Sequence, residues 1–363
     1  MPTEKEMMEQ LRRGKLSLPP LSLRLLQVQA KTGGDNLFDA FVQASWRDNK
    51  ARFAVEFKSI WTPKVSKNTL DLLKTSRLPK GYLPMLIMPF LGEPQLQELE
   101  RLKISGIDLC GNGVVIVPGR FAVYRSGEKN RFPSSASIKN IYRKNSSMVG
   151  RVFLARSCYA TVQAICAEVN QRNLLVQQWG TKPMGLSTVS KSLKILDEDL
   201  IVTRKAAIRL LQADKLLENL SENFVPPKIK ERVRLKVAEA EGTILEWLWT
   251  QSRELGLPLV VTGTSSVTQY AAMQRGDLLS VYCPRLEMLL ERLPGSQADR
   301  FPNIELIETE DETVFFDARQ QRNVWWASPV QVYLELMAGD KRDQETAEQV
   351  RSFILMNVQP EQS

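Results

Sequence analysis

The sequence predicts a chain of several α/β domains, and three observations support this prediction. Its 363 residues exceed one ordinary domain, and a composition of 43% hydrophobic and 25% charged residues is typical of globular proteins. Apolar strands alternate with helical stretches over residues 37–119 and again over 257–337. A polar, basic segment lies between these two regions. We therefore expect three domains, over residues 1–125, 126–225 and 226–363.

The first domain is expected to begin with helices and to continue with a hairpin. Residues 4–13 have an amphipathic pattern, and a second helical stretch is expected before the turn at 32–36. Period-2 alternation then predicts strands over 37–46 and 51–61, joined by a turn at 47–50. The other expected elements are a helix over 66–76, a strand over 82–90, a helix over 93–106 and short strands over 107–110 and 113–119.

The middle domain is expected to be mainly helical. A linker or DNA-facing arm over 126–147 precedes a strongly helical stretch over 148–173, and a short helix is expected within 174–181. After a tight turn come a helix over 186–197 and two short strands within 200–211. Helix, helix, turn, helix and β-wing is the order of a winged helix-turn-helix, whose last helix enters the major groove of DNA.

The third domain is expected to be a small α/β domain. A helical stretch over 211–250 leads into strands that alternate with helices up to residue 337. The segment "SPVQVYLELM" (328–337) is expected to be one of these helices.

The composition excludes several classes of chemistry. The chain contains no histidine, so His-dependent triads and His-ligated metals are excluded. Its four cysteines show no CxxC spacing, which argues against a zinc site or a disulfide framework. No apolar stretch is long enough for a membrane helix or has the form of a signal peptide. We therefore expect a cytoplasmic protein without a cofactor and without membrane contact.

Positive charge is concentrated in the middle of the chain. The net charge is +8, and residues 119–209 hold 16 Lys and Arg against five Asp and Glu, or +11. The rest of the chain therefore sums to −3. Because Lys and Arg that neutralise phosphates release counterions, such a segment favours a nucleic-acid partner, here double-stranded DNA.

The helix over 186–197 carries the main candidates for DNA contact. Leu186, Val189, Leu193 and Leu196 have the spacing of one buried face, which leaves hydroxyl groups and lysines on the other. No arginine lies on that outward face, so guanine recognition by a guanidinium is not evident. The alternative is a winged helix that serves only in dimerisation or docking. The predicted DNA-contacting residues are Lys139, Arg143, Lys144, Ser187, Thr188, Ser190, Lys191, Lys194, Arg204 and Lys205.

The hairpin of the first domain carries a Glu-x-Lys pair. Glu56 and Lys58 lie two residues apart on one strand and therefore on the same face. Restriction-endonuclease-like enzymes use such a pair, with an upstream Asp, to hold Mg²⁺ and steady the attacked phosphate. Asp39 on the preceding strand is the only well-placed candidate. A cross-strand ion pair explains the Glu-x-Lys pair equally well, so we expect the restriction-endonuclease-like fold without activity.

Several short motifs resemble the abortive-infection antitoxin family, the AbiEi-type proteins of type IV toxin-antitoxin systems. The motifs are "EFK", "ISGIDLCGNGVVIVPG", "IKNIYRKNSS", "GLSTVSKSLKIL" and "SPVQVYLELMAGDKRDQETAEQVRSFI", and the resemblance spans about residues 37–355. It implies a winged-helix repressor of its own operon, with the recognition helix at 186–197 and the wing at 200–211. It also implies a C-terminal region that opposes a nucleotidyltransferase toxin without forming a stable complex.

Three functions remain open from the sequence. The first is a sequence-specific DNA-binding transcriptional regulator, an antitoxin-like autorepressor without catalysis of its own. The second is a Mg²⁺-dependent DNA nuclease that uses Asp39, Glu56 and Lys58. The third is a DNA-binding protein of plasmid maintenance or replication. Winged helices often bind paired half-sites as homodimers, but the sequence assigns no dimer interface.

Overall fold

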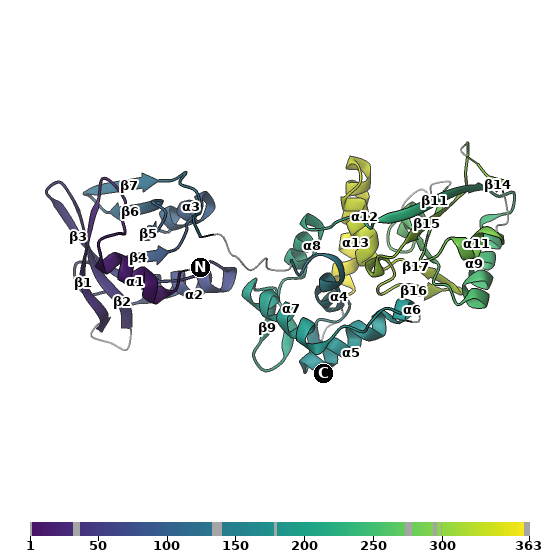
Figure 1. Ribbon diagram of the computed structural model, residues 1–363, viewed down its shortest axis with the longest axis horizontal. Coiled ribbons are helices and arrows are strands. Elements are labelled where there is room, and N and C mark those ends of the chain that lie inside the picture. The colour runs from purple at the N-terminus through teal and green to yellow at the C-terminus, as the bar shows by residue number, and fades with distance from the viewer. Residues whose placement is uncertain are drawn as a thin grey trace. The chain divides into compact units, whose positions relative to one another are not determined.

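In the computed structural model, the chain forms two compact units, Met1–Ile138 and Lys139–Ser363 (Figure 1). The predicted α/β class is confirmed, because mixed sheets with packed helices occur in the chain. The structure describes residues 2–31, 37–132, 140–177, 180–272, 278–292, 296–298 and 300–358.

The N-terminal unit is built on one seven-stranded sheet, as far as its residues are described. Its elements are α1 (Glu4–Arg12), β1 (Ser22–Lys31), β2 (Leu37–Trp46), β3 (Asn49–Phe57), α2 (Pro63–Thr75), β4 (Tyr82–Met88), α3 (Glu93–Arg101), β5 (Ser105–Asp108), β6 (Gly113–Val117) and β7 (Phe121–Arg125).

The strands of this sheet follow one another in chain order, from β1 to β7. The expected hairpin is present, since β2 and β3 pair antiparallel with Ala40 opposite Val55. Strands β3, β4 and β5 pair parallel, and the helices α2 and α3 form the crossovers between them. Met7 and Leu11 of α1 are buried in the core on one side of the sheet. Residues of α2 and α3, among them Leu70 and Leu96, are buried in a second cluster.

The second helical stretch expected before residue 32 is wrong, because residues 22–31 form strand β1. This strand pairs antiparallel with β2 and has a register shift between Leu25 and Gln27. Leu, Arg and Gln are good helix formers, and this local preference produced the helical prediction. The exposed edge of β2 offers hydrogen bonds along the whole segment, and this tertiary pairing overrides the local preference.

The C-terminal unit contains two sheets among its described residues, one of three strands and one of seven. Its first part contains η1 (Lys144–Ser147), α4 (Met148–Ala155), β8 (Cys158–Tyr159), α5 (Val162–Arg172), α6 (Leu174–Gln177), α7 (Leu186–Glu198), β9 (Val202–Arg204), β10 (Ile208–Leu210) and α8 (Ala213–Glu222). Its second part contains β11 (Ile229–Lys236), α9 (Glu241–Leu255), β12 (Val260–Thr262), α10 (Gly263–Val267), β13 (Leu279–Cys283), α11 (Glu287–Leu290), β14 (Ser296–Gln297), β15 (Ile304–Thr309), η2 (Glu312–Val314), β16 (Arg319–Gln321), β17 (Val324–Trp326), α12 (Pro329–Met337) and α13 (Lys341–Met356).

One buried hydrophobic cluster contains residues from both parts of the C-terminal unit, and a second cluster lies within the second part. The small sheet has the order β8-β10-β9, and the large one has the order β14-β11-β15-β13-β12-β17-β16. Helices α12 and α13 lie side by side (Figure 1). Val149 and Phe153 of α4 belong to the same buried cluster as Phe315 and Phe316 of the second part. The division into separate domains over residues 126–225 and 226–363 stays a prediction. Residues from both ranges belong to one buried cluster.

The helical stretch expected over residues 211–250 is wrong at its centre, because "IKERVRLK" forms strand β11. Val233 and Leu235 are buried while Arg232 and Arg234 are exposed, which is the period-2 pattern of a half-buried strand. Five charged side chains in eight residues weakened this pattern in the sequence.

No helix among the described residues is long and apolar enough to cross a membrane.

Candidate nucleic-acid interface

Helix α7 is held in place by the turn that precedes it. Asn170 of α5 donates from Nδ2 to the Met184 carbonyl at 3.1 Å and accepts from the Met184 amide at 2.7 Å. The Cys166 thiol also donates to the Met184 carbonyl, at 3.3 Å. Because both side chains lie on α5, the start of α7 is fixed relative to that helix. The helix itself begins after Gly185, where no side chain caps its first turn.

One face of α7 is buried and the opposite face is exposed. Val189 and Leu193 are fully buried and Leu196 is 1% exposed, so these three predicted core positions are in the core. Leu186 is 44% exposed, so its predicted place in the buried face is wrong. It is the first residue of the helix, one turn beyond the packed residues. The outward residues predicted from the sequence are exposed: Ser187, Thr188, Ser190, Lys191 and Lys194.

The strand pair β9 and β10 follows α7 directly. It pairs antiparallel with Ile208 opposite Arg204, and β10 also pairs with β8. Val202 is fully buried and Ile208 is 6% exposed, so the hairpin is anchored in the core. Arg204 and Lys205 are exposed at its turn. Two exposed cations therefore lie at the turn of the strand pair that directly follows α7 in the chain.

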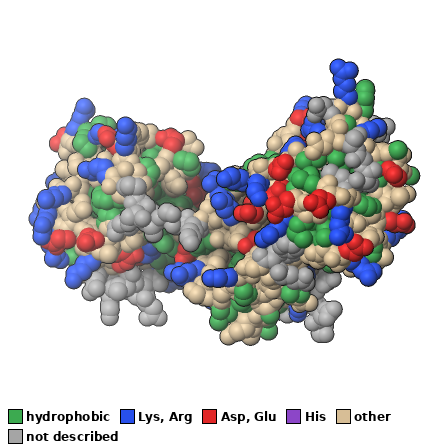
Figure 2. Space-filling view, turned by 45° about the vertical axis from the view of Figure 1, so that its right-hand side comes forward, with side chains coloured by type: hydrophobic (Ala, Val, Ile, Leu, Met, Phe, Trp, Pro, Cys, Tyr) green, Lys and Arg blue, Asp and Glu red, His purple; other side chains and the backbone are tan. Residues whose placement is uncertain are grey.

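The other predicted contacts precede α4. Arg143 and Lys144 are exposed, and Lys144 begins the short helix η1. Lys139 lies outside the described residues. Lys and Arg side chains occur over both units in the view of Figure 2, so basic residues are not confined to residues 119–209.

The acidic cluster at the end of α7 has structural partners. Glu198 lies 3.9 Å from Lys194, one helical turn earlier. Asp199 accepts a hydrogen bond of 2.6 Å from the Tyr142 hydroxyl, and burial together with this bond raises the pKa of Tyr142. Asp199 thus ties the end of α7 to the segment before α4.

A second group of candidate residues meets in the N-terminal unit. The register that pairs Ala40 with Val55 places Asp39 of β2 beside Glu56 of β3. Asp39 Oδ2 accepts from the Phe57 amide at 2.8 Å. Lys58 Nζ lies 3.2 Å from Glu56 Oε2. The three residues predicted from the sequence are therefore neighbours in the structure.

The sequence did not predict that Glu4 belongs to this group. Glu4 Oε1 of α1 lies 3.9 Å from Lys58 Nζ, and Glu4 lines a pocket of about 650 Å³ together with Asp39 and Phe57. Because α1 packs on the sheet through Met7, its N-terminal turn reaches the ends of β2 and β3. No sequence motif links Glu4 to a strand residue so far along the chain.

Glu56 is a buried carboxylate close to another carboxylate. It is 5% exposed, and burial raises the pKa of Glu56 above its ordinary value of 4.5. The Asp39 charge raises this pKa further, whereas Lys58 lowers it. A buried carboxylate beside another carboxylate is costly for stability, and pKa values perturbed in this way are characteristic of functional sites. Among the described residues, however, no three His, Cys, Asp or Glu side chains are grouped closely enough to hold a metal ion.

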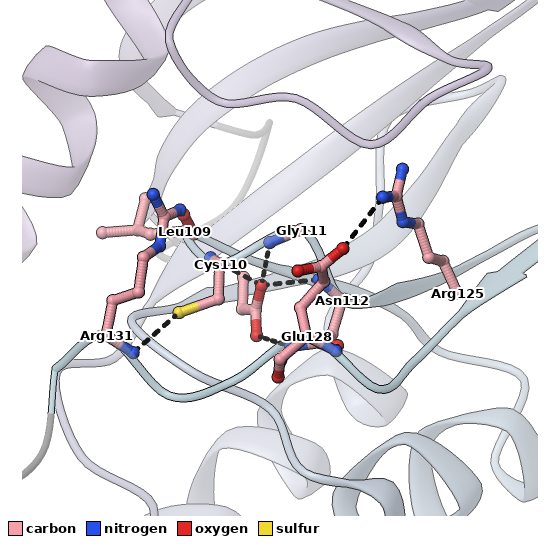
Figure 3. Close-up of polar contacts among 8 residues, drawn as sticks. Leu109, Cys110, Gly111, Asn112, Arg125, Glu128 and Arg131 are labelled. Carbon is pink, nitrogen blue, oxygen red and sulfur yellow. Dashed lines mark hydrogen bonds and ion pairs between the residues drawn. The ribbon is translucent and has the colours of Figure 1, made fainter.

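Asp108, in the motif "ISGIDLCGNGVVIVPG", has a different role. It is 1% exposed and its carboxylate accepts hydrogen bonds of 2.7–2.9 Å from the amides of Leu91, Cys110, Gly111 and Asn112 and from Asn112 Nδ2. Gly111 has a φ of 107°, which favours glycine. Figure 3 shows Arg131 beside this loop, where its guanidinium donates to the Leu109 carbonyl. The carboxylate is engaged by these donors, so it shapes the loop.

Comparison with protein families gives a match in the C-terminal unit. Residues 209–356, less than half of the chain, match the family described as "Transcriptional regulator, AbiEi antitoxin, Type IV TA system". Comparisons with curated proteins and with solved structures gave no match. The matched region starts at β10 and includes the large sheet, α12 and α13. The resemblance found in the sequence is thereby confirmed for this region. Over residues 209–356, the chain is similar to the AbiEi antitoxin family of type IV toxin-antitoxin systems.

Proposed function

We propose that the chain is a DNA-binding transcriptional regulator that represses its own operon and acts as the antitoxin of a type IV system. The order α4, β8, α5, α7, β9 and β10, with the sheet order β8-β10-β9, is that expected of a winged helix-turn-helix. The observation that carries the proposal is the exposed face of α7, which presents hydroxyl groups and two lysines and is followed in the chain by the exposed cationic β9–β10 turn. The family description supports the regulatory role.

The proposed docking places α7 in the major groove and the β9–β10 turn against the DNA backbone. Lys191 and Lys194 are then close to phosphates, and each phosphate contact releases condensed counterions. Arg204 and Lys205 add two contacts outside the groove. Ser187 and Thr188, at the start of the helix, are placed to reach base edges.

Binding to the duplex upstream of its own gene tests this proposal. The double variant Lys191→Ala/Lys194→Ala is compared with wild type by fluorescence anisotropy over a series of salt concentrations. We expect weaker binding and a log–log salt slope that is smaller by about 2. The control Lys341→Ala/Arg342→Ala removes two exposed cations at the start of α13 and should bind as wild type does. Equal affinity and slope for both double variants would contradict the assignment of α7.

The antitoxin role is tested in cells. The neighbouring gene is expected to encode a nucleotidyltransferase toxin. Expression of the chain should restore the growth of cells that express this toxin. A pull-down should detect no stable complex between the chain and the toxin. The chain should repress a reporter fused to the operon promoter. In this proposal it acts in the cytoplasm and binds paired half-sites as a homodimer. A replication origin in place of a toxin gene, with no effect on the reporter, would favour plasmid maintenance instead.

A second candidate function is Mg²⁺-dependent cleavage of DNA by the N-terminal unit. It is favoured by the proximity of Asp39, Glu56 and Lys58, in which Asp39 and Glu4 line one pocket and Glu4 Oε1 lies 3.9 Å from Lys58 Nζ. Helix α1, the β2–β3 hairpin, helix α2 and the parallel strand β4 keep the α-β-β-α-β order expected for the restriction-endonuclease-like fold, and β1 adds a strand before the hairpin. Mg²⁺ is commonly bound by one or two carboxylates together with waters and substrate phosphates, so Asp39 and Glu56 would suffice. Lys58 would then stabilise the charge on the attacked phosphate.

Plasmid DNA incubated with Mg²⁺ or Mn²⁺ tests this candidate. Cleavage by wild type should be abolished by Glu56→Ala and Asp39→Asn, while DNA binding is kept. The matched control Glu100→Gln changes an exposed carboxylate of the same unit and should cleave normally. If wild type leaves the plasmid intact with both metals, and calorimetry detects no metal binding, the second candidate is refuted. The proposed regulator would be unaffected by that result.

A further inference from the structure

Leu186 is an exposed apolar side chain at the start of the exposed face of α7. We propose that it contacts the 5-methyl group of thymine in the major groove and thereby selects sites that contain thymine. This inference rests on the proposed DNA-binding function. Leu186 is 44% exposed, whereas Val189 and Leu193, on the same helix, are fully buried. Its position therefore contributes little to the core.

The place of Leu186 suits contact with base edges. The N-terminal residues of a recognition helix are those that meet bases in the groove. Leu186 is the first residue of α7, and its Cα–Cβ bond is tilted toward the N-terminal end of the helix. Gly185 before it has a negative φ, and a Cβ at that position would meet no atom within 4 Å. Neither backbone conformation nor packing requires this glycine, whose small size leaves room for a duplex close to Leu186.

The chemistry of the neighbouring residues identifies thymine as the target. Ser187 and Thr188 have hydroxyl groups, which can donate to or accept from several bases. The exposed face of α7 contains no Arg, Asn or Gln that would select guanine or adenine through a bidentate contact, and its two lysines, which could also reach guanine, are assigned to phosphates in the proposed docking. The thymine methyl is the one apolar group that base pairs present in the major groove. An exposed leucine is complementary to it, and burial of both removes apolar surface from water.

The experiment uses a duplex selected from a random library by the full-length protein. Each thymine of the selected site is replaced in turn by deoxyuridine, which lacks only the 5-methyl group. For wild type we expect a loss of affinity of about fourfold at one or two positions, as for one methyl-sized group returned to water. Leu186→Ala should bind the thymine duplex more weakly and show no further loss with deoxyuridine. Leu186→Met, which keeps an apolar side chain, should restore the sensitivity.

Controls separate this inference from the proposed function. Leu290→Ala removes a leucine that is 39% exposed on α11, and it should keep the wild-type response to deoxyuridine. Three outcomes would each overturn the inference. The selected site could contain no thymine, wild type could bind thymine and deoxyuridine duplexes equally well, or Leu186→Ala could lose as much affinity with deoxyuridine as wild type does. If binding nevertheless depends on Lys191 and Lys194, the proposed regulator stands. Absence of any DNA binding would overturn both.

Discussion

Arg151 of α4 donates from Nη1 to Oε1 of Gln331 in α12 at 2.9 Å, across 180 positions of the chain. The same nitrogen donates to the Thr313 carbonyl at 3.2 Å, and Arg151 Nε has no hydrogen-bond partner among the described residues. Burial lowers the pKa of Arg151 to about 10, although Asp311 and Glu335 raise it. A buried guanidinium thus joins the helical part of the C-terminal unit to its second part.

Arg151→Met is expected to destabilise the C-terminal unit by about 2 kcal/mol, because Gln331 Oε1 and the Thr313 carbonyl lose their donor in a buried place. The double variant Arg151→Met/Gln331→Met should lose less stability than the sum of the two single variants, since Gln331 Oε1 already lacks its donor in Arg151→Met, although Gln331→Met also removes the Nε2 donor to Glu335 Oε1. Urea unfolding followed by tryptophan fluorescence measures both. Independent, additive effects of the two substitutions would contradict the predicted coupling.

A fragment of residues 226–363 is expected not to fold by itself, whereas residues 139–363 should unfold cooperatively. Val149 and Phe153 fill the same buried cluster as Phe315 and Phe316, so the shorter fragment leaves large apolar side chains without their contacts. Thermal unfolding followed by near-UV circular dichroism distinguishes the two. A cooperative transition of the shorter fragment would show instead that residues 226–363 form an independent domain.

Asp108→Asn is expected to destabilise the N-terminal unit by about 2–4 kcal/mol. The carboxylate accepts five hydrogen bonds, and an amide nitrogen in place of one oxygen would face donors such as the Leu91 amide. Denaturant unfolding measures the loss. Glu100→Gln, at an exposed position of the same unit, serves as the control and should leave the midpoint unchanged.

Glu56→Gln is expected to gain stability relative to wild type as the pH rises from 4 to 7. The pKa of Glu56 is raised in the folded protein, so the unfolded chain loses this proton at a lower pH than the folded chain does. Wild-type stability therefore falls as pH rises through the interval between the two pKa values. The free energy of unfolding at several pH values measures this difference. A constant difference between the two proteins over this range would argue against the raised pKa.

Arg204→Ala/Lys205→Ala is expected to weaken binding to all duplexes by a similar factor and to reduce the salt slope by about 2. Both side chains are exposed at the β9–β10 turn, where they are placed to meet phosphates. Competition between selected and random duplexes should show unchanged sequence preference, in contrast to Leu186→Ala. A changed preference would place the turn against base edges.

Elements with a local signal could be predicted from the amino-acid sequence. The alternation in residues 37–57 fixed the β2–β3 hairpin, and its register in turn placed Asp39 beside Glu56. The spacing of Val189, Leu193 and Leu196 fixed the buried face of α7. Each of these signals repeats within one or two turns or strands, so nearby residues suffice to specify it.

Features that depend on distant partners followed from tertiary contacts and could not be predicted from local patterns. Residues 22–31 became a strand because the edge of β2 was available, and Ile229–Lys236 became a strand because it pairs with β15. Glu4 joins the Asp39–Glu56 group because α1 packs on the sheet, and Leu186 is exposed because the core ends one turn later. These outcomes depend on contacts between residues far apart in the chain, which local propensity and periodicity do not contain.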